Sequence, residues 1–92
     1  MALETRHAPD ASRYELYDDG ELVGFADYVL TGDVAVFPHT EVVRARRGQG
    51  LGERLVRDAL DAERAAGHKI VASCWYVAEF LDDHPEYRAL TA

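Results

Sequence analysis

The sequence has little cysteine and no pattern of metal ligands. Cys74 is its single cysteine, so it has no disulfide partner within the chain and cannot build a structural zinc site. The four histidines also show no metal-ligand spacing, and they are His7, His39, His68 and His84. We therefore expect no bound metal.

Long apolar runs are missing as well. No stretch approaches the roughly 20 apolar residues that a membrane-spanning helix needs. The N-terminal stretch MALETRHAPDASRYEL also lacks the apolar region of a secretory signal. We expect a cytoplasmic protein with no membrane partner and with Cys74 in its reduced form.

Basic residues are in the minority, with 10 Lys and Arg against 17 Asp and Glu for a formal net charge of -7. This balance argues against a nucleic-acid partner, because such binding relies on a broad basic face. The arginines nevertheless gather in one region, at Arg44, Arg46, Arg47 and Arg54. A local basic site on an acidic protein suits a small anionic ligand.

The composition is that of a globular protein, with 48% hydrophobic and 29% charged residues in a chain of 92. This length has room for one compact domain. Residues 1–12 are polar and contain Pro9, so we predict that they form a flexible lead-in. The single domain is predicted to span residues 13–92.

The first half of the domain is rich in strand signals. The turn sequences DDG and TGD separate three strand-like runs, which are Tyr14–Tyr17, Glu21–Leu30 and Val34–Val43. Short turns between such runs predict an antiparallel meander. Pro38 interrupts the third run, which predicts a kink or bulge, or the meeting of two strand segments.

The second half changes to a helical period. An apolar stripe predicts an amphipathic helix over Leu51–Ala66, and its members are Leu51, Leu55, Val56, Ala59, Leu60, Ala62 and Ala66. Gly67 ends this helix, a buried strand follows at Lys69–Cys74, and Tyr76–Asp83 is predicted to be a second helix that Pro85 ends. We expect the tail to pack through Tyr87 and Leu90.

A strand-helix-strand crossover normally makes its two strands parallel. The predicted fold class is therefore α/β, in its α+β form. We expect a mixed, mostly antiparallel sheet with one β-α-β crossover and two main helices.

The stretch RRGQGLGERL over residues 46–55 carries the strongest ligand signal. The first N–H groups of a helix have no intrahelical acceptor and lie at the positive end of the helix dipole. Glycines allow an anion to approach this backbone closely. A dinucleotide fingerprint needs GxGxxG and a Walker A loop needs GK[ST], and neither pattern is present. The pattern that remains is RxxGxG.

This RxxGxG loop resembles the acyl-CoA pyrophosphate loop of the GNAT superfamily of N-acetyltransferases. More narrowly, the chain is similar to the small single-domain GNAT-like group. HTEV at residues 39–42 and CWYVAEFLDDHPEY at residues 74–87 support this resemblance, which runs from about Arg13 to Leu90. It implies a minimal GNAT-like fold whose sheet splays beyond the loop.

The resemblance also implies acetyl-CoA as cosubstrate. Main-chain groups near Val42 and Val43 would contact the pantetheine arm and thioester, and the loop N–H groups would hold the pyrophosphate. The implied coenzyme A contacts are Val42, Val43, Arg47, Gly48, Gln49, Gly50, Leu51 and Gly52. Arg46 and Arg47 would add positive charge.

Two residues are candidates for the chemistry at the acetyl group. The resemblance implies that Cys74 lies near this group, as a transient acyl acceptor or as part of the site that handles the thiolate. A thiol needs activation by a neighbour, for which His39 is the most attractive candidate. Cys74 could instead be a small buried hydrophobic residue, and His39 a structural residue bonded to Glu41 or to backbone.

The sequence departs from the relatives at several places. Phe80 stands where they often carry a tyrosine that could donate a proton, and Tyr76 lies nearby. Ala72, Trp75 and Arg44 replace prolines.

The leading hypothesis is an acetyl-CoA-dependent N-acetyltransferase acting directly or through Cys74. A coenzyme A-binding module without efficient catalysis and a non-catalytic interaction protein are the alternatives. The amine acceptor, which could be a protein, a peptide or a polyamine, is left open. The oligomeric state is expected to be a monomer or weak homodimer.

Overall fold

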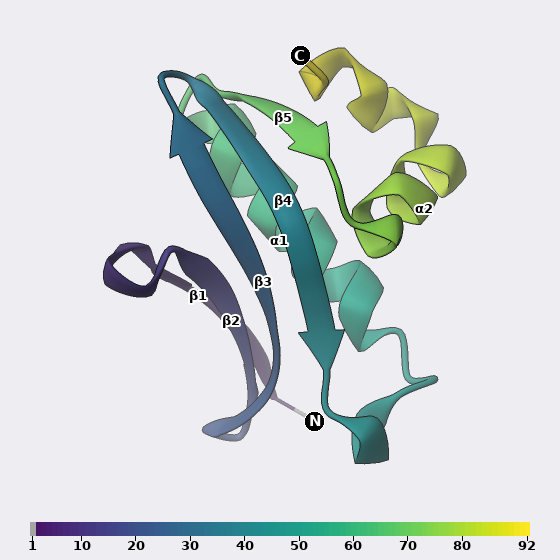
Figure 1. The fold of residues 1–92 in the computed structure, drawn as a ribbon. Coiled ribbons are helices and arrows are strands. Elements are labelled where there is room, and N and C mark those ends of the chain that lie inside the picture. Colours follow the sequence, from purple (N-terminus) through teal and green to yellow (C-terminus); the bar gives the residue numbers. More distant parts are fainter. Residues whose placement is uncertain (1) are drawn as a thin grey trace.

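The computed structural model describes residues 2–92 and contains a five-stranded sheet with helices packed against it (Figure 1). The strands are β1 (Leu3–Ala8), β2 (Arg13–Asp18), β3 (Glu21–Thr31), β4 (Val34–Val42) and β5 (Lys69–Ala72). The α-helices are α1 (Leu51–Ala65) and α2 (Trp75–Asp83), and the 3-10 helices are η1 (Pro9–Ala11), η2 (Arg44–Arg46) and η3 (Pro85–Leu90).

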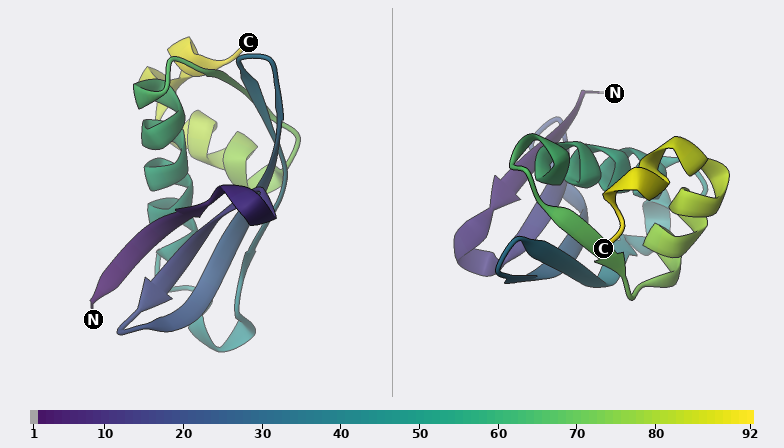
Figure 2. Two further views of the ribbon diagram at one scale, coloured as in Figure 1. Left: turned by 90° about the vertical axis from the view of Figure 1, so that its left-hand side faces the viewer. Right: turned by 90° about the horizontal axis from the view of Figure 1, so that it is seen from above.

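The strands lie in the order β1-β2-β3-β4-β5. The first four are antiparallel neighbours, whereas β5 runs parallel to β4 after the crossover through α1. Helix α1 packs along one face of the sheet, with α2 beside it near β5 (Figure 2). The predicted meander, crossover and mixed sheet are therefore confirmed. Within residues 2–92, no helix is long and apolar enough to cross a membrane.

Strand β1 corrects the prediction that residues 1–12 form a lead-in without a structural element. It pairs with β2 along its whole length, and Met1 lies outside the described residues. Polar contacts hold β1 in place: the Thr5 hydroxyl donates to Asp58 Oδ2 (2.6 Å), and His7 Nε2 lies 2.6 Å from the Tyr28 hydroxyl. Because these contacts involve polar residues, the sequence of β1 lacks the apolar alternation by which strands are predicted.

A bulge interrupts β4 at Pro38, as the sequence predicts. Asp27 pairs with His39 and Val29 with Val36, so Phe37 and Pro38 together lie opposite Tyr28 on β3. The extra residue places Phe37 and Thr40 on the same buried face of β4, and His39 is exposed.

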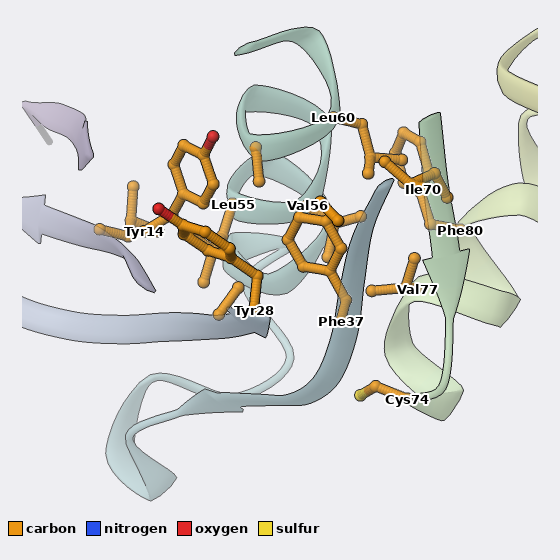
Figure 3. Packing of buried hydrophobic residues seen from close by; sticks show 14 of the residues in the cluster. Tyr14, Tyr28, Phe37, Leu55, Val56, Leu60, Ile70, Cys74, Val77 and Phe80 are labelled. Atoms are coloured by element: carbon orange, nitrogen blue, oxygen red, sulfur yellow. The ribbon is translucent and has the colours of Figure 1, made fainter. Parts of the chain in front are cut away.

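The core lies between the sheet and α1, and Figure 3 shows the packing of its central residues, including Tyr14, Phe37, Leu55 and Ile70. The buried residues of α1 are Leu51, Gly52, Leu55, Val56, Ala59, Leu60 and Glu63. The predicted stripe is confirmed up to Leu60, but Ala62 and Ala66 are exposed. Tyr87 and Leu90 are buried, which confirms that the tail packs onto the domain.

Strand β5 pairs with only the first half of β4. The ladder runs from Val34–Lys69 to Phe37–Ala72, and one further bond joins the Ser73 N–H to the Phe37 carbonyl (3.1 Å). Beyond Phe37, β4 continues beside β3 alone while the chain turns into α2 (Figure 1). The sheet therefore splits along the second half of β4, which agrees with the splay that the resemblance implies.

Candidate functional site

The glycine loop joins the end of β4 to the start of α1. Gly48 has φ 83° and Gly50 has φ 75°, which are left-handed conformations that residues with a side chain rarely adopt. Gly50 occupies the N-cap position, and the helix begins at Leu51. These two glycines lie in the turn that leads the chain from η2 into α1.

The loop leaves a run of main-chain donors free. Among the described residues, no hydrogen-bond acceptor is found for the N–H groups of residues 48–53, and the first bonded N–H is that of Arg54, which donates to the Gly50 carbonyl (3.2 Å). The N-terminus of a helix adds partial positive charge. This arrangement of donors suits a phosphate or pyrophosphate group.

The arginines of the loop have different roles. Arg46 is a structural tie, because its guanidinium donates to Asp18 Oδ2 (2.5 Å) and to the side chain of Gln49 (3.1 Å). This contact lowers the pKa of Asp18 below its ordinary value. Arg47 instead donates from Nε to the Val42 carbonyl (3.1 Å), which places it at the end of β4.

Gly52 is needed for a different reason from Gly48 and Gly50. A Cβ at this position would lie 2.5 Å from Cε1 of Tyr76, and real Cβ atoms essentially never come so close to another atom. The absence of a side chain thus allows α2 to pack its first turn directly against the start of α1. Tyr76 also stacks on Trp75, with ring centroids 4.3 Å apart.

A cleft of about 320 Å³ lies beside the second half of β4. We call it the β4–α2 cleft, and its lining residues are His39, Thr40, Glu41, Val42, Arg47, Trp75 and Tyr76. It combines an aromatic wall from α2 with polar groups from β4. Of the predicted site residues, the structure brings His39, Val42 and Arg47 together here.

Along the second half of β4, the main-chain N–H and C=O groups of every second residue face the split in the sheet. The Val43 N–H donates to the Val23 carbonyl (2.9 Å), and antiparallel strands alternate the side on which their hydrogen-bonding groups lie. The N–H and C=O groups of Thr40 and Val42 therefore face away from β3. Of the two predicted contacts, Val42 presents its backbone to the split, whereas the N–H of Val43 is used within the sheet.

Thr40 is a site residue that the sequence prediction missed. Its side chain is 5% exposed, and its Oγ1 has no hydrogen-bond partner among residues 2–92. Leaving a buried hydroxyl unpaired costs roughly 1–3 kcal/mol. The bulge predicted at Pro38 could have indicated the burial of Thr40, because one extra residue shifts Thr40 onto the buried face of β4.

His39 forms a pair with Glu41 at the mouth of the cleft. His39 Nε2 lies 3.3 Å from Glu41 Oε1, and the two side chains are 54% and 49% exposed. The His39 ring also lies beside that of Phe25, with centroids 5.9 Å apart. This pair can accept and pass on a proton at the solvent side of the cleft.

Cys74 lies at the N-cap position of α2, where the chain leaves β5. It is 7% exposed and belongs to the core cluster, where it lies near Val77 (Figure 3). No hydrogen bond joins it to His39 among the described residues, and His39 is bonded to Glu41 instead. Among residues 2–92, the structure therefore does not join the two predicted catalytic residues by a hydrogen bond.

The HPEY segment, residues 84–87, joins the end of α2 and the C-terminal tail to α1. His84 Nε2 lies 2.6 Å from Glu53 Oε1 at the start of α1, and the Tyr87 hydroxyl donates to Asp61 (2.8 Å). Phe80 is buried beside both rings, with centroids 4.4 Å from His84 and 5.0 Å from Tyr87. Phe80 is thus a packing residue, and it has no hydroxyl to donate.

Together these features suit an elongated anionic ligand. The free donors of the glycine loop can hold its phosphate end, and the unpaired edge of β4 can bond an extended polar arm. Among residues 2–92, no three His, Cys, Asp or Glu side chains are grouped as metal ligands. The prediction that no metal is bound stays a prediction.

Comparison with known proteins gives a family match over most of the chain. A family model described as GCN5-related N-acetyl-transferase matches residues 13–90. Among curated proteins, mycothiol acetyltransferase from Nocardia farcinica is 46% identical over 56 residues, which cover 59% of this chain and 18% of that protein. Human protein NATD1 is 36% identical over 47 residues, which cover 51% of this chain and 42% of NATD1. The chain thus spans less than half the length of these relatives.

Solved structures show the same fold. A GCN5-like protein from Staphylococcus aureus, solved by NMR, has a TM-score of 0.74 and 22% sequence identity, covering 98% of this chain and 88% of that protein. The ribosomal-protein-S18-alanine N-acetyltransferase of Escherichia coli has a TM-score of 0.62 and 23% identity, covering 65% of this chain and 39% of that enzyme. At these identities the likeness concerns the fold alone.

Proposed function

The chain belongs to the GCN5-related N-acetyltransferase family, and from this premise we propose that it transfers an acetyl group from acetyl-CoA to an amine. The observation that carries the proposal is the run of free N–H groups at residues 48–53, directly beside the unpaired half of β4. The free N–H groups best suit a pyrophosphate, and the unpaired half of β4 suits the amide-bearing pantetheine arm.

In this proposal the cosubstrate lies along the loop and the β4–α2 cleft. The N–H groups of residues 48–52 hold the pyrophosphate, and the Val42 N–H bonds the pantetheine arm. Arg47 adds positive charge at the junction, where it already reaches the Val42 carbonyl (3.1 Å). Gly52 keeps the start of α1 close to Tyr76.

The reaction needs a neutral amine that attacks the thioester carbon. The amine nitrogen forms a bond to this carbon, the carbon–sulfur bond breaks, and the sulfur leaves with the bonding electron pair. His39, oriented by Glu41 (3.3 Å), takes the proton from the amine and returns it to the thiolate. One amide and one free thiol are formed.

A direct transfer fits the surroundings of Cys74 better than an acyl-enzyme. The thiol is 7% exposed, and its candidate base, His39, is bonded to Glu41 instead. A nucleophilic cysteine needs an activating neighbour. Intact-mass measurement after incubation with acetyl-CoA tests the route. For direct transfer, we expect no acetyl adduct on Cys74, so the wild type and Cys74→Ala should show the same pattern of adducts.

The acceptor is proposed to be an amine of a protein, a peptide or a polyamine. Glu41 and the indole of Trp75, which is 66% exposed, line the same cleft. A carboxylate and an aromatic face both attract an ammonium group before it loses its proton. The net charge of -7 also favours cationic acceptors.

A coenzyme A-binding module without efficient turnover is the second candidate. It is favoured by Phe80, which is buried in packing contacts and offers no hydroxyl to the leaving thiolate. Binding with no thiol release for any amine would support this candidate.

The test of the proposed function is a thiol-release assay with acetyl-CoA and a panel of polyamines, lysine peptides and peptides with free N-termini. We expect release with at least one amine and a large loss of rate in His39→Ala. A matched control is His7→Ala, since His7 contacts Tyr28 outside the cleft. No release with any amine, or equal rates in His39→Ala and the wild type, would contradict the proposal.

A further inference from the structure

Thr40 combines burial with polar groups that lack partners. It is 5% exposed, and its Oγ1 has no hydrogen-bond partner among the described residues. Its main-chain N–H and C=O groups lie on the edge of β4 that faces away from β3, past the last pair with β5. Buried polar groups in folded proteins are nearly always hydrogen-bonded, so this residue points to a ligand that supplies the missing partner.

The place of Thr40 along β4 suggests which part of a ligand it meets. Both Thr40 and Val42 line the β4–α2 cleft, and Thr40 is two residues further from the glycine loop. Two residues of strand correspond to about 6.6 Å. A ligand with its pyrophosphate on the loop and its arm along β4 brings the acyl end toward Thr40.

Resting on the proposed function, we propose that the Thr40 hydroxyl donates a hydrogen bond to the thioester carbonyl oxygen of bound acetyl-CoA. This makes Thr40 a catalytic residue, because the carbonyl oxygen gains negative charge as the amine adds to the carbon. When the carbon–sulfur bond breaks, the electron pair leaves with the sulfur and the carbonyl forms again. Thr40 keeps its proton throughout, and the proton of the amine reaches the sulfur through His39.

The burial of the hydroxyl strengthens its effect on the reaction. A donor in a site with little water interacts with a developing charge more strongly than a solvated donor does. It also needs no rearrangement of partners, since Oγ1 has no bond to break.

Calorimetric titrations of acetyl-CoA and of free coenzyme A into Thr40→Val and Thr40→Ser test the proposal. Coenzyme A lacks the acyl carbonyl, so Thr40→Val should weaken acetyl-CoA binding about three- to tenfold and leave coenzyme A binding unchanged. Thr40→Ser keeps the hydroxyl and should bind both ligands nearly as the wild type does. Thr5→Val is the matched control, because its hydroxyl bonds Asp58 (2.6 Å) outside the cleft.

Thermal unfolding without ligand tests whether Thr40 has a purely structural role, because only such a role predicts a lower melting temperature for Thr40→Val. Thr40→Val loses no hydrogen bond and should melt at the wild-type temperature or above, whereas Thr5→Val should melt lower. A lower melting temperature for Thr40→Val, or equal losses for acetyl-CoA and coenzyme A, would overturn the inference. So would an unchanged affinity for acetyl-CoA. If the wild type binds neither ligand, the proposed function itself is overturned, and the inference with it.

Discussion

Glu63 shows how one residue can depart from the pattern of its helix. It is 4% exposed on α1, where its carboxylate accepts a hydrogen bond from the Tyr14 hydroxyl and lies 2.8 Å from His68 Nδ1. The Tyr14 ring stacks on His7 of β1, with centroids 4.4 Å apart. A buried carboxylate with two partners thus joins the end of α1 to the sheet at the far end from the glycine loop.

This contact predicts a loss of stability at high pH. Burial, followed by the hydrogen bond to Glu63, raises the pKa of Tyr14 above its ordinary value of about 10. The folded state therefore keeps the phenolic proton to higher pH than the unfolded state does, so this contribution is complete below about pH 10 and is lost as the pH rises further.

Urea unfolding at several values between pH 8 and pH 11 measures the effect. The free energy of unfolding should fall more steeply with pH in the wild type than in Tyr14→Phe, which has no phenolic proton. Tyr76→Phe, which removes a phenol from α2 and leaves the Tyr14–Glu63 contact intact, is the control. Equal slopes for the wild type and Tyr14→Phe would contradict the role given to Tyr14.

At the scale of elements, the contact between α1 and α2 depends on a single missing side chain. Gly52 lets the Tyr76 ring approach the start of α1, and the same first turn carries the free N–H groups. The packing of α2 and the proposed ligand donors therefore share the first turn of α1.

Gly52→Ala should destabilise the fold by about 1–3 kcal/mol, because the added methyl group overpacks against the Tyr76 ring. Urea unfolding measures this loss. The double variant Gly52→Ala with Tyr76→Ala relieves the clash, so the two changes should cost less together than the sum of the single changes. Additive losses would contradict the close approach of Tyr76 to Gly52.

Strand β1 makes a second prediction at this scale. Deletion of residues 2–8 removes the Thr5–Asp58 and His7–Tyr28 hydrogen bonds and uncovers the edge of β2. The deletion also removes the β1–β2 ladder. Since each hydrogen bond contributes about 0.5–1.5 kcal/mol, the free energy of unfolding should fall by at least about 1–3 kcal/mol. An unchanged urea midpoint would contradict the pairing of β1 with β2.

The elements that the sequence predicts are those with a clear apolar period. Strands β2–β5 and both α-helices fall close to their predicted bounds, since alternation and the helical stripe mark them. Strand β1 has no such pattern, because it is an edge strand held by polar contacts of Thr5 and His7. The burial of Glu63 was missed for a similar reason, since its partner Tyr14 lies 49 residues away in the sequence.

For the whole molecule, the position of the site follows from the crossover. Strand β5 leaves β4 after Phe37, and the chain enters α1 through a loop whose N–H groups at residues 48–53 have no partner within residues 2–92. The motif RxxGxG identified the loop, and the positive φ values of Gly48 and Gly50 agree with it. The sequence could not reveal that Val43 is used within the sheet or that Thr40 lacks a partner, because both depend on strand register.

The most direct test of the account is the binding of acetyl-CoA by calorimetry to the wild type and to two glycine variants. Gly50→Glu places a carboxylate among the free N–H groups, whereas Gly32→Glu adds the same side chain at a turn of similar backbone conformation, with φ 62° against 75°. At either position, no atom of the described residues lies within 4 Å of an added Cβ. We predict saturable binding by the wild type and by Gly32→Glu, and a loss of at least about tenfold in affinity for Gly50→Glu. Equal affinities in all three proteins, or no binding by the wild type, would contradict the central claim.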